Sequence, residues 1–230
     1  MNTLLLVHGW GAGPSCWQRQ EAHFRGRGRV LAPALQGRDA AWLAAYLRNL
    51  PLPRTMAVGW SLGGMLLLEA VAAIPLQPAA LVLIAAPAVF CRRPDHPWGQ
   101  PPAAVRAMRQ GLTQDPGRVL RNFAHACLAD GETAYQTEIT GLFTSPADSD
   151  GLAAGLDYLL KRDLRPLLHR VTCPVLLLHG AQDRIVPPAQ GQWLTQALPD
   201  ARLRLLPRAG HAPFLTQAAL VNAALEEELA

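Results

Sequence analysis

Short apolar runs alternate with longer stretches of helical periodicity along most of the chain. Strand-like runs lie near residues 3–7, 29–32, 55–59, 80–85, 174–179 and 202–206. Apolar residues recur at helical spacing over about 15–25, 39–49, 62–73, 188–198 and 214–229. Such alternation predicts a parallel sheet with helices on both faces. Two of the strand-like runs, 81–84 and 175–178, are continuously apolar, which is typical of central parallel strands. We therefore expect an α/β fold with about six mostly parallel strands.

The alternation is interrupted between about Ala88 and His169. This stretch opens with several prolines and then becomes mixed and helical in pattern. We interpret 88–169 as a helical cap inserted into a core made of 1–87 and 170–230. The first strand begins almost at Met1, so we expect no hairpin before it.

The pentapeptide Gly59-Trp60-Ser61-Leu62-Gly63 lies between a predicted strand and a predicted helix. Glycines on both sides of a serine permit a strand-to-helix turn too tight for larger side chains, and this turn exposes the hydroxyl as a nucleophile. The simpler interpretation is that Ser61 only caps the following helix. The motif by itself does not separate the two.

An acid and a histidine follow Ser61 in the order that a serine hydrolase of this architecture requires. Asp183 comes after the run 175–178, and His211 comes after the run 202–206. Because the carboxyl ends of parallel strands share one edge, both should lie near Ser61. His211 would then act as the base and Asp183 would orient it. Taken singly, Asp183 could be an exposed loop acid and His211 a structural turn residue.

The segment His8-Gly9-Trp10-Gly11 follows the first predicted strand. An oxyanion hole in this architecture takes one backbone N–H from the residue after the nucleophile and one from the loop after an early strand. These are Leu62 and Trp10. The side chain of Trp10 either lines an acyl pocket or belongs to the core, and we expect His8 to be structural, bonding to neighbouring loops.

Composition narrows the class of protein further. Half of the residues are hydrophobic, so a large core can form, and the net charge of +4 is too small to indicate nucleic-acid binding. The four cysteines have no metal-binding spacing, and no phosphate-binding glycine motif is present. No apolar run approaches the roughly 18 residues of a membrane helix. We expect a cytoplasmic monomer without metal, cofactor or membrane contact.

Three segments together resemble a known family. His8–Gly11, Gly59–Gly64 and Gly210-His211-Ala212-Pro213-Phe214 are similar to the pimeloyl-[acyl-carrier protein] methyl ester esterases of biotin synthesis. In the cap, 118–123 is similar to an arginine-bearing helix of that family. The resemblance implies the α/β-hydrolase fold and a serine acyl-enzyme that removes the methyl group from a pimeloyl ester.

The resemblance also implies an acidic partner, because the ester is carried on acyl carrier protein. Residues 92–121 hold six arginines against two aspartates. Arg118 and Arg121, and after them Arg109, would meet the carrier at the cap rim, while Phe123 would line the acyl tunnel. The plainer interpretation of this charge bias is a solvated helix surface.

Three other functions stay open on the sequence. A general short-chain carboxylesterase, lipase or lactonase would use the same triad on free small esters. A receptor or scaffold with this fold usually lacks a triad residue. Cofactor-free dioxygenases share the fold, and motif alone does not separate them.

Overall fold

The computed structural model describes residues 2–35, 37–143 and 149–229. Six strands form one sheet in the order β2-β1-β3-β4-β5-β6, and every neighbouring pair is parallel. The predicted strands are therefore confirmed, and the sheet is wholly rather than mostly parallel. The strands are β1 (Thr3–Val7), β2 (Arg29–Leu31), β3 (Thr55–Trp60), β4 (Ala80–Ile84), β5 (Val175–Gly180) and β6 (Ala201–Leu206).

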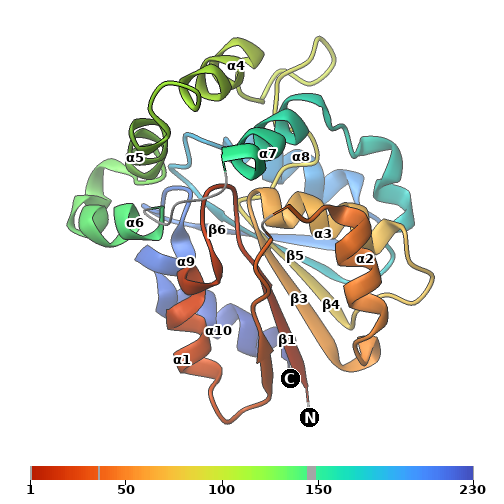
Figure 1. Cartoon of the computed structure of the whole chain (residues 1–230). Coiled ribbons are helices and arrows are strands. Elements are labelled where there is room, and N and C mark those ends of the chain that lie inside the picture. Colours follow the sequence, from red (N-terminus) through yellow and green to blue (C-terminus); the bar gives the residue numbers. More distant parts are fainter. Residues whose placement is uncertain (1, 36, 144–148, 230) are drawn as a thin grey trace.

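Helices cover both faces of the sheet. Figure 1 shows α1 and α10 on one side and α2 and α3 on the other. The helices outside the β4–β5 segment are η1 (Pro14–Trp17), α1 (Gln18–Phe24), α2 (Ala40–Arg48), η2 (Leu52–Arg54), α3 (Leu62–Ala72), α8 (Pro188–Ala197), α9 (Pro213–Thr216) and α10 (Ala218–Leu229).

The C-terminal helix, predicted as one element over 214–229, is two helices. The backbone of Gln217 leaves helical geometry at φ −128° and ψ 43°, between α9 and α10. Its side-chain amide donates a 2.6 Å hydrogen bond to the carbonyl of Pro207. The break lets the chain change direction between α9, which packs against η1 and α1, and α10, which also packs against α1. A periodic pattern alone does not reveal such a local change of direction.

The middle of the sheet forms the core. Every residue of β1, β3, β4 and β5 is buried, whereas the edge strands β2 and β6 are largely accessible. Helix α3 is buried on nearly all sides, and Glu69 is its only partly exposed residue. A helix that is apolar all round belongs inside a core. The start of α3, which carries the serine motif, is therefore rigidly placed.

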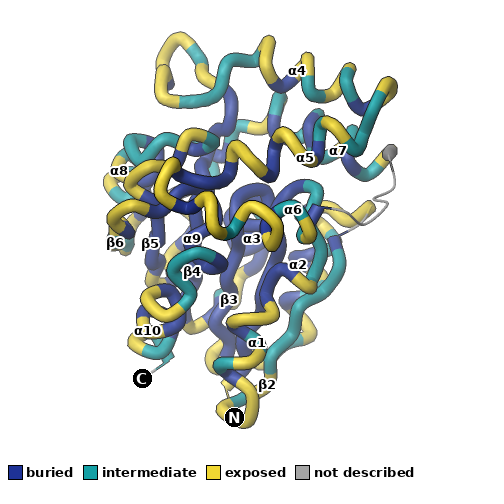
Figure 2. The backbone as a smooth tube through the Cα atoms, turned by 90° about the vertical axis from the view of Figure 1, so that its left-hand side faces the viewer, coloured by how far each residue is buried: buried dark blue, intermediate teal, exposed yellow. Residues whose placement is uncertain are grey.

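The interrupted stretch between β4 and β5 is helical. Figure 1 shows α4, α5 and α7 beyond the carboxyl ends of the strands, and Figure 2 shows that much of the outermost helix α4 is exposed. That 88–169 forms a unit apart from the core stays a prediction; we call it the cap segment. Its helices are α4 (Pro102–Gly111), α5 (Pro116–Ala126), η3 (Asp130–Tyr135), α6 (Gln136–Leu142), α7 (Ser149–Lys161) and η4 (Arg165–Arg170).

Candidate active site

The serine motif forms a strained turn between β3 and α3. Ser61 has φ 54° and ψ −120°, a backbone conformation that side chains rarely adopt. A Cβ on Gly63 would lie 2.3 Å from the carbonyl oxygen of His8, and one on Gly59 would lie 2.6 Å from Cα of Gly64. Both glycines are therefore needed for the close approach. The Ser61 hydroxyl makes no capping bond to α3, so the helix-cap interpretation fails.

The fold brings Ser61, His211 and Asp183 into one hydrogen-bonded chain. The Ser61 hydroxyl lies 2.9 Å from Nε2 of His211, and Nδ1 of His211 lies 2.8 Å from Oδ2 of Asp183. All three residues are buried. An ionised carboxylate only accepts hydrogen bonds, so the imidazole proton sits on Nδ1 and leaves Nε2 free to accept the serine proton. The arrangement can generate a serine nucleophile.

Asp183 is held ionised in a buried loop after β5. Its Oδ1 accepts hydrogen bonds from the backbone N–H groups of Ile185, at 2.8 Å, and Val186, at 2.9 Å. Burial by itself would raise the pKa of this carboxyl, but His211 and the nearby His179 outweigh burial and lower the pKa to about 2. The carboxylate therefore stays charged beside the imidazole at neutral pH.

The backbone of His211 is held from two sides. Nε1 of Trp60 donates a 2.9 Å hydrogen bond to the His211 carbonyl. The His211 N–H donates a 2.7 Å bond to the carbonyl of Cys127, which follows α5 in the cap segment. The loop of the base is thus fixed both by the residue before the nucleophile and by the cap segment. The sequence analysis did not foresee either contact.

The predicted oxyanion donors lie beside the nucleophile. A Cβ on Gly9, the residue before Trp10, would come within 3.3 Å of the Ser61 Cβ. Leu62 is the first residue of α3, where no helical carbonyl precedes its N–H to accept a hydrogen bond. Gly9 thus approaches the serine side chain and Leu62 directly follows it in the chain; that the N–H groups of Trp10 and Leu62 form an oxyanion hole stays a prediction.

The Trp10 side chain connects the site to the cap segment. Its indole Nε1 donates a 2.9 Å hydrogen bond to the carbonyl of Leu152 in α7, and its ring meets Phe123 of α5 edge-on at 5.1 Å between centroids. The Phe123 ring also lies 6.3 Å from the His211 ring. A cavity of about 440 Å³ adjoins this cluster, with a mainly apolar lining that includes Trp10, Leu35, Leu62, Leu66, Leu152 and Tyr158.

The cap arginines fall into two groups. Arg118 and Arg121 are exposed on α5 and form no ion pair with the described residues. Arg109 of α4 instead pairs with Asp157 of α7 at 2.7 Å. Arg109 thus ties two cap helices together, whereas Arg118 and Arg121 present their charges outward.

Other residues support the site without entering the chemistry. His8 is structural, as expected: its Nε2 accepts a 3.0 Å hydrogen bond from the backbone N–H of Leu35. Burial raises the pKa of the Cys127 thiol, so it is not a competing nucleophile. Sequence reasoning missed the contacts of Trp60, Cys127, His179 and Glu132, because no local pattern marks them.

Within residues 2–35, 37–143 and 149–229, no cluster of three or more His, Cys, Asp or Glu side chains could hold a metal ion. The helices described over the same ranges are all too short or too polar to cross a bilayer.

A sequence model of the alpha/beta hydrolase family matches residues 4–224. The chain belongs to this family. It is similar to the pimeloyl-[acyl-carrier protein] methyl ester esterase of Aromatoleum aromaticum, with 36% identity over 93% of this chain and 92% of that protein. The protein of the same name from Chromobacterium violaceum is 33% identical over 98% of this chain and 93% of its own. The predicted family resemblance and the prediction of an ester hydrolase are confirmed.

Solved structures of alpha/beta hydrolases share the fold. An esterase from Exiguobacterium antarcticum superposes with a TM-score of 0.89, at 22% identity, over 100% of this chain and 92% of its own. A protein described as a bromoperoxidase from Bacillus anthracis gives the same TM-score and identity, over 99% of this chain and 91% of that protein. At this identity the likeness concerns the fold alone, and it confirms the predicted fold class.

Proposed function

We propose that this alpha/beta hydrolase removes the methyl group from pimeloyl-[acyl-carrier protein] methyl ester in biotin synthesis. The observation that carries the proposal is the buried chain from Ser61 through His211 to Asp183, with contacts of 2.9 and 2.8 Å. The names of relatives at 36% and 33% identity supply the substrate. The general esterase for free esters is the alternative that the experiments below separate.

The reaction follows from the geometry. His211 Nε2 accepts the proton of the Ser61 hydroxyl as Oγ attacks the ester carbonyl, and the N–H groups of Trp10 and Leu62 stabilise the oxyanion. The C–O bond to the methoxy group then breaks, and methanol leaves with the proton from His211. Water, deprotonated by the same imidazole, attacks the acyl-enzyme and frees the carboxylic acid and the serine.

The apolar cavity supports an acyl chain as ligand. A pimeloyl chain is a run of methylene groups, and burying each one contributes about 0.8 kcal/mol. The cavity of about 440 Å³ lies in the range typical of small-molecule sites. In the proposal, Trp10 and Leu62 line the passage at Ser61, and Phe123 covers the chain from the cap segment.

The exposed arginines of α5 support a carrier-bound substrate. Acyl carrier protein is acidic, and Arg118 and Arg121 are exposed on α5, where neither pairs with an acid in the described part of the chain. Charge complementarity of this kind raises the rate of association more than the final affinity. Arg109 contributes less in this proposal, because Asp157 already neutralises it.

The protein is further proposed to act in the cytoplasm, as a monomer. All four cysteines are buried and free, which fits a reducing compartment.

The decisive test compares carrier-bound and free esters. The double variant Arg118→Glu/Arg121→Glu should lower kcat/KM for pimeloyl-[acyl-carrier protein] methyl ester on the order of tenfold to a hundredfold and leave p-nitrophenyl butyrate hydrolysis unchanged. Arg54→Glu is the matched control, since Arg54 is exposed in η2, before β3. Equal losses on both substrates would contradict the docking role.

A genetic test addresses the substrate directly. The wild-type gene should restore growth without biotin to a bacterial strain that lacks its own methyl esterase, and Ser61→Ala should not. Failure of the wild type to rescue, together with rapid turnover of short free esters, would favour the general esterase.

A further inference from the structure

A buried carboxylate in the cap segment contacts the loop of the catalytic base. Glu132 of η3 is 5% exposed, and its Oε2 accepts hydrogen bonds from two backbone N–H groups. One donor is Ala129, at 2.8 Å, and the other is Gly210, at 2.9 Å. Gly210 directly precedes His211, so a side chain 78 residues away in sequence bonds to the backbone of the base's own loop.

The loop and the cap segment approach too closely for a side chain at position 210. A Cβ on Gly210 would lie 2.5 Å from the Cys127 carbonyl oxygen, 2.7 Å from Ala129 N and 2.9 Å from Glu132 Oε2. The Cys127 carbonyl also accepts the N–H of His211. We call residues 127–132 the clasp, because this short segment bonds to two successive residues of the loop.

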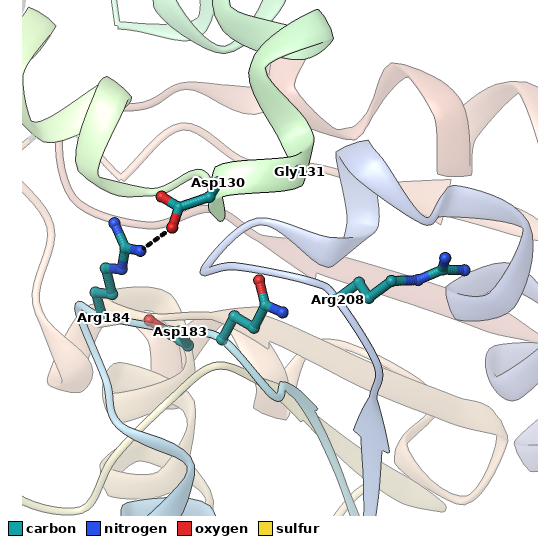
Figure 3. A pocket seen from close by; sticks show the side chains of 6 residues that line it. Asp130, Gly131, Asp183, Arg184 and Arg208 are labelled. Carbon is teal, nitrogen blue, oxygen red and sulfur yellow. Dashed lines mark hydrogen bonds and ion pairs between the residues drawn. The ribbon is translucent and has the colours of Figure 1, made fainter.

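The clasp also reaches the loop of Asp183. Figure 3 shows Asp130 in an ion pair with Arg184, the residue after Asp183, at the rim of a surface pocket. The two charges are 2.7 Å apart, with 83% and 62% of their side chains exposed. Exposed pairs of this kind contribute about 0–1 kcal/mol. The buried Glu132 therefore fixes the clasp more firmly than the exposed ion pair does.

Glu132 caps its own helix, because it is the third residue of η3 and accepts the N–H of the N-cap residue Ala129, but the bond to Gly210 goes beyond capping. Its second oxygen, Oε1, is buried and forms no hydrogen bond with the described residues. Burying a carboxylate with an unsatisfied oxygen costs free energy that an apolar side chain would not. What the carboxylate provides is a charged acceptor for two N–H groups, and charge-assisted bonds are about twice as strong as neutral ones.

We propose that Glu132 is a positioning residue for His211. By fixing Gly210 against the clasp, it keeps the imidazole within hydrogen-bond reach of both Ser61 and Asp183. The inference rests on the proposed function in one respect, namely that His211 is the base of the reaction. Glu132 itself touches neither substrate nor reacting atoms.

The test measures turnover on p-nitrophenyl butyrate in folded variants. Glu132→Ala removes the acceptor and should lower kcat about 10- to 100-fold, the loss expected from a small misplacement of a catalytic group, with KM within about twofold. Glu132→Asp keeps the charge but shortens the reach to Gly210, and should lower kcat as well. Glu132→Gln keeps one acceptor oxygen and should retain more activity than either.

Glu138→Ala is the matched control. Glu138 is also a cap-segment glutamate that reaches the core, but its hydrogen bonds within the described residues go to Arg19 of α1 and not to the loop of His211. This variant should keep the wild-type kcat. The low-field proton NMR signal of His211 Nδ1–H should broaden or shift in Glu132→Ala and stay unchanged in Glu138→Ala, because only the first loosens the imidazole.

The outcomes separate the two proposals. A folded Glu132→Ala with wild-type kcat and an unchanged NMR signal would overturn the positioning role, and if Glu132→Ala does not fold, the same result with Glu132→Asp would overturn it. Equal losses in Glu132→Ala and Glu138→Ala would do so too. Activity of Ser61→Ala would instead contradict the proposed function, whatever the Glu132 variants show.

Discussion

The indole of Trp60 and the backbone of His211 are joined by a 2.9 Å hydrogen bond from Nε1 to the carbonyl oxygen. The two residues are 151 positions apart in sequence. Trp60 immediately precedes the nucleophile, so one side chain ties the strained serine turn to the loop of the base. This contact therefore helps to keep the Ser61 hydroxyl and the His211 imidazole at their spacing. It involves neither of these two groups, only the Trp60 indole and the His211 backbone.

Trp60→Phe should separate this bond from simple packing. Loss of the hydrogen bond leaves the buried His211 carbonyl unpaired, which costs about 1–3 kcal/mol. If about 1.4 kcal/mol of this cost falls on the transition state, kcat drops tenfold. Trp17→Phe is the control: Trp17 is equally buried, packs on the same Phe214 ring, and its indole N–H has no partner among the described residues. Both variants should lose stability in urea unfolding, but only Trp60→Phe should lose turnover.

The strained turn at Ser61 predicts a gain in stability on replacement. A non-glycine residue held in such a conformation costs on the order of 1–3 kcal/mol, which glycine does not pay. Ser61→Gly should therefore unfold at a higher urea concentration than Ser61→Ala, because its free energy of unfolding is higher by about 1 kcal/mol. Both variants should be inactive. An alanine variant as stable as the glycine variant would show that the turn stores no strain.

Gly155 of α7 makes room for the Trp10 indole. A Cβ there would lie 2.7 Å from Cδ1 of that ring, which must then move away from Leu152 and Phe123. Gly155→Ala should lower kcat/KM for butyrate esters roughly tenfold, because the Trp10 backbone supplies an oxyanion donor in the proposed mechanism. Gly141→Ala in α6, where a Cβ would come within 4 Å of none of the described atoms, should leave kcat/KM unchanged.

The lowered pKa of Asp183 predicts a pH-dependent stability. The folded state holds this carboxyl at a pKa of about 2, below the ordinary 3.8, so its ionised form stabilises the fold above about pH 4. That contribution, about 2 kcal/mol, should disappear as pH falls from about 4 towards 2. Urea unfolding of the wild type and Asp183→Asn at several pH values measures it. The difference between their free energies of unfolding should shrink as pH falls from about 4.5 towards 2.5; a constant difference over that range would contradict the assignment.

Local patterns were enough to locate the strands and the candidate triad. The continuous apolar runs of β4 and β5 are typical of buried strands, and glycines around Ser61 mark a turn that larger residues could not form. The break at Gln217 was missed, because the apolar pattern continues through it and only the backbone geometry of the folded chain separates α9 from α10.

By itself, the sequence determined the order of strands and helices, the serine turn and the chain order of Ser61, Asp183 and His211, because these depend on short-range periodicity and on backbone sterics. Only the tertiary structure decided which distant groups meet: Trp60 with the His211 carbonyl, Cys127 with the His211 N–H, and Glu132 with Gly210. The last two of these contacts join the core to the segment between β4 and β5. No local sequence pattern shows that a glutamate will be buried or which N–H group a carbonyl will accept. The hydrogen-bond partner depends on how distant parts of the chain pack together.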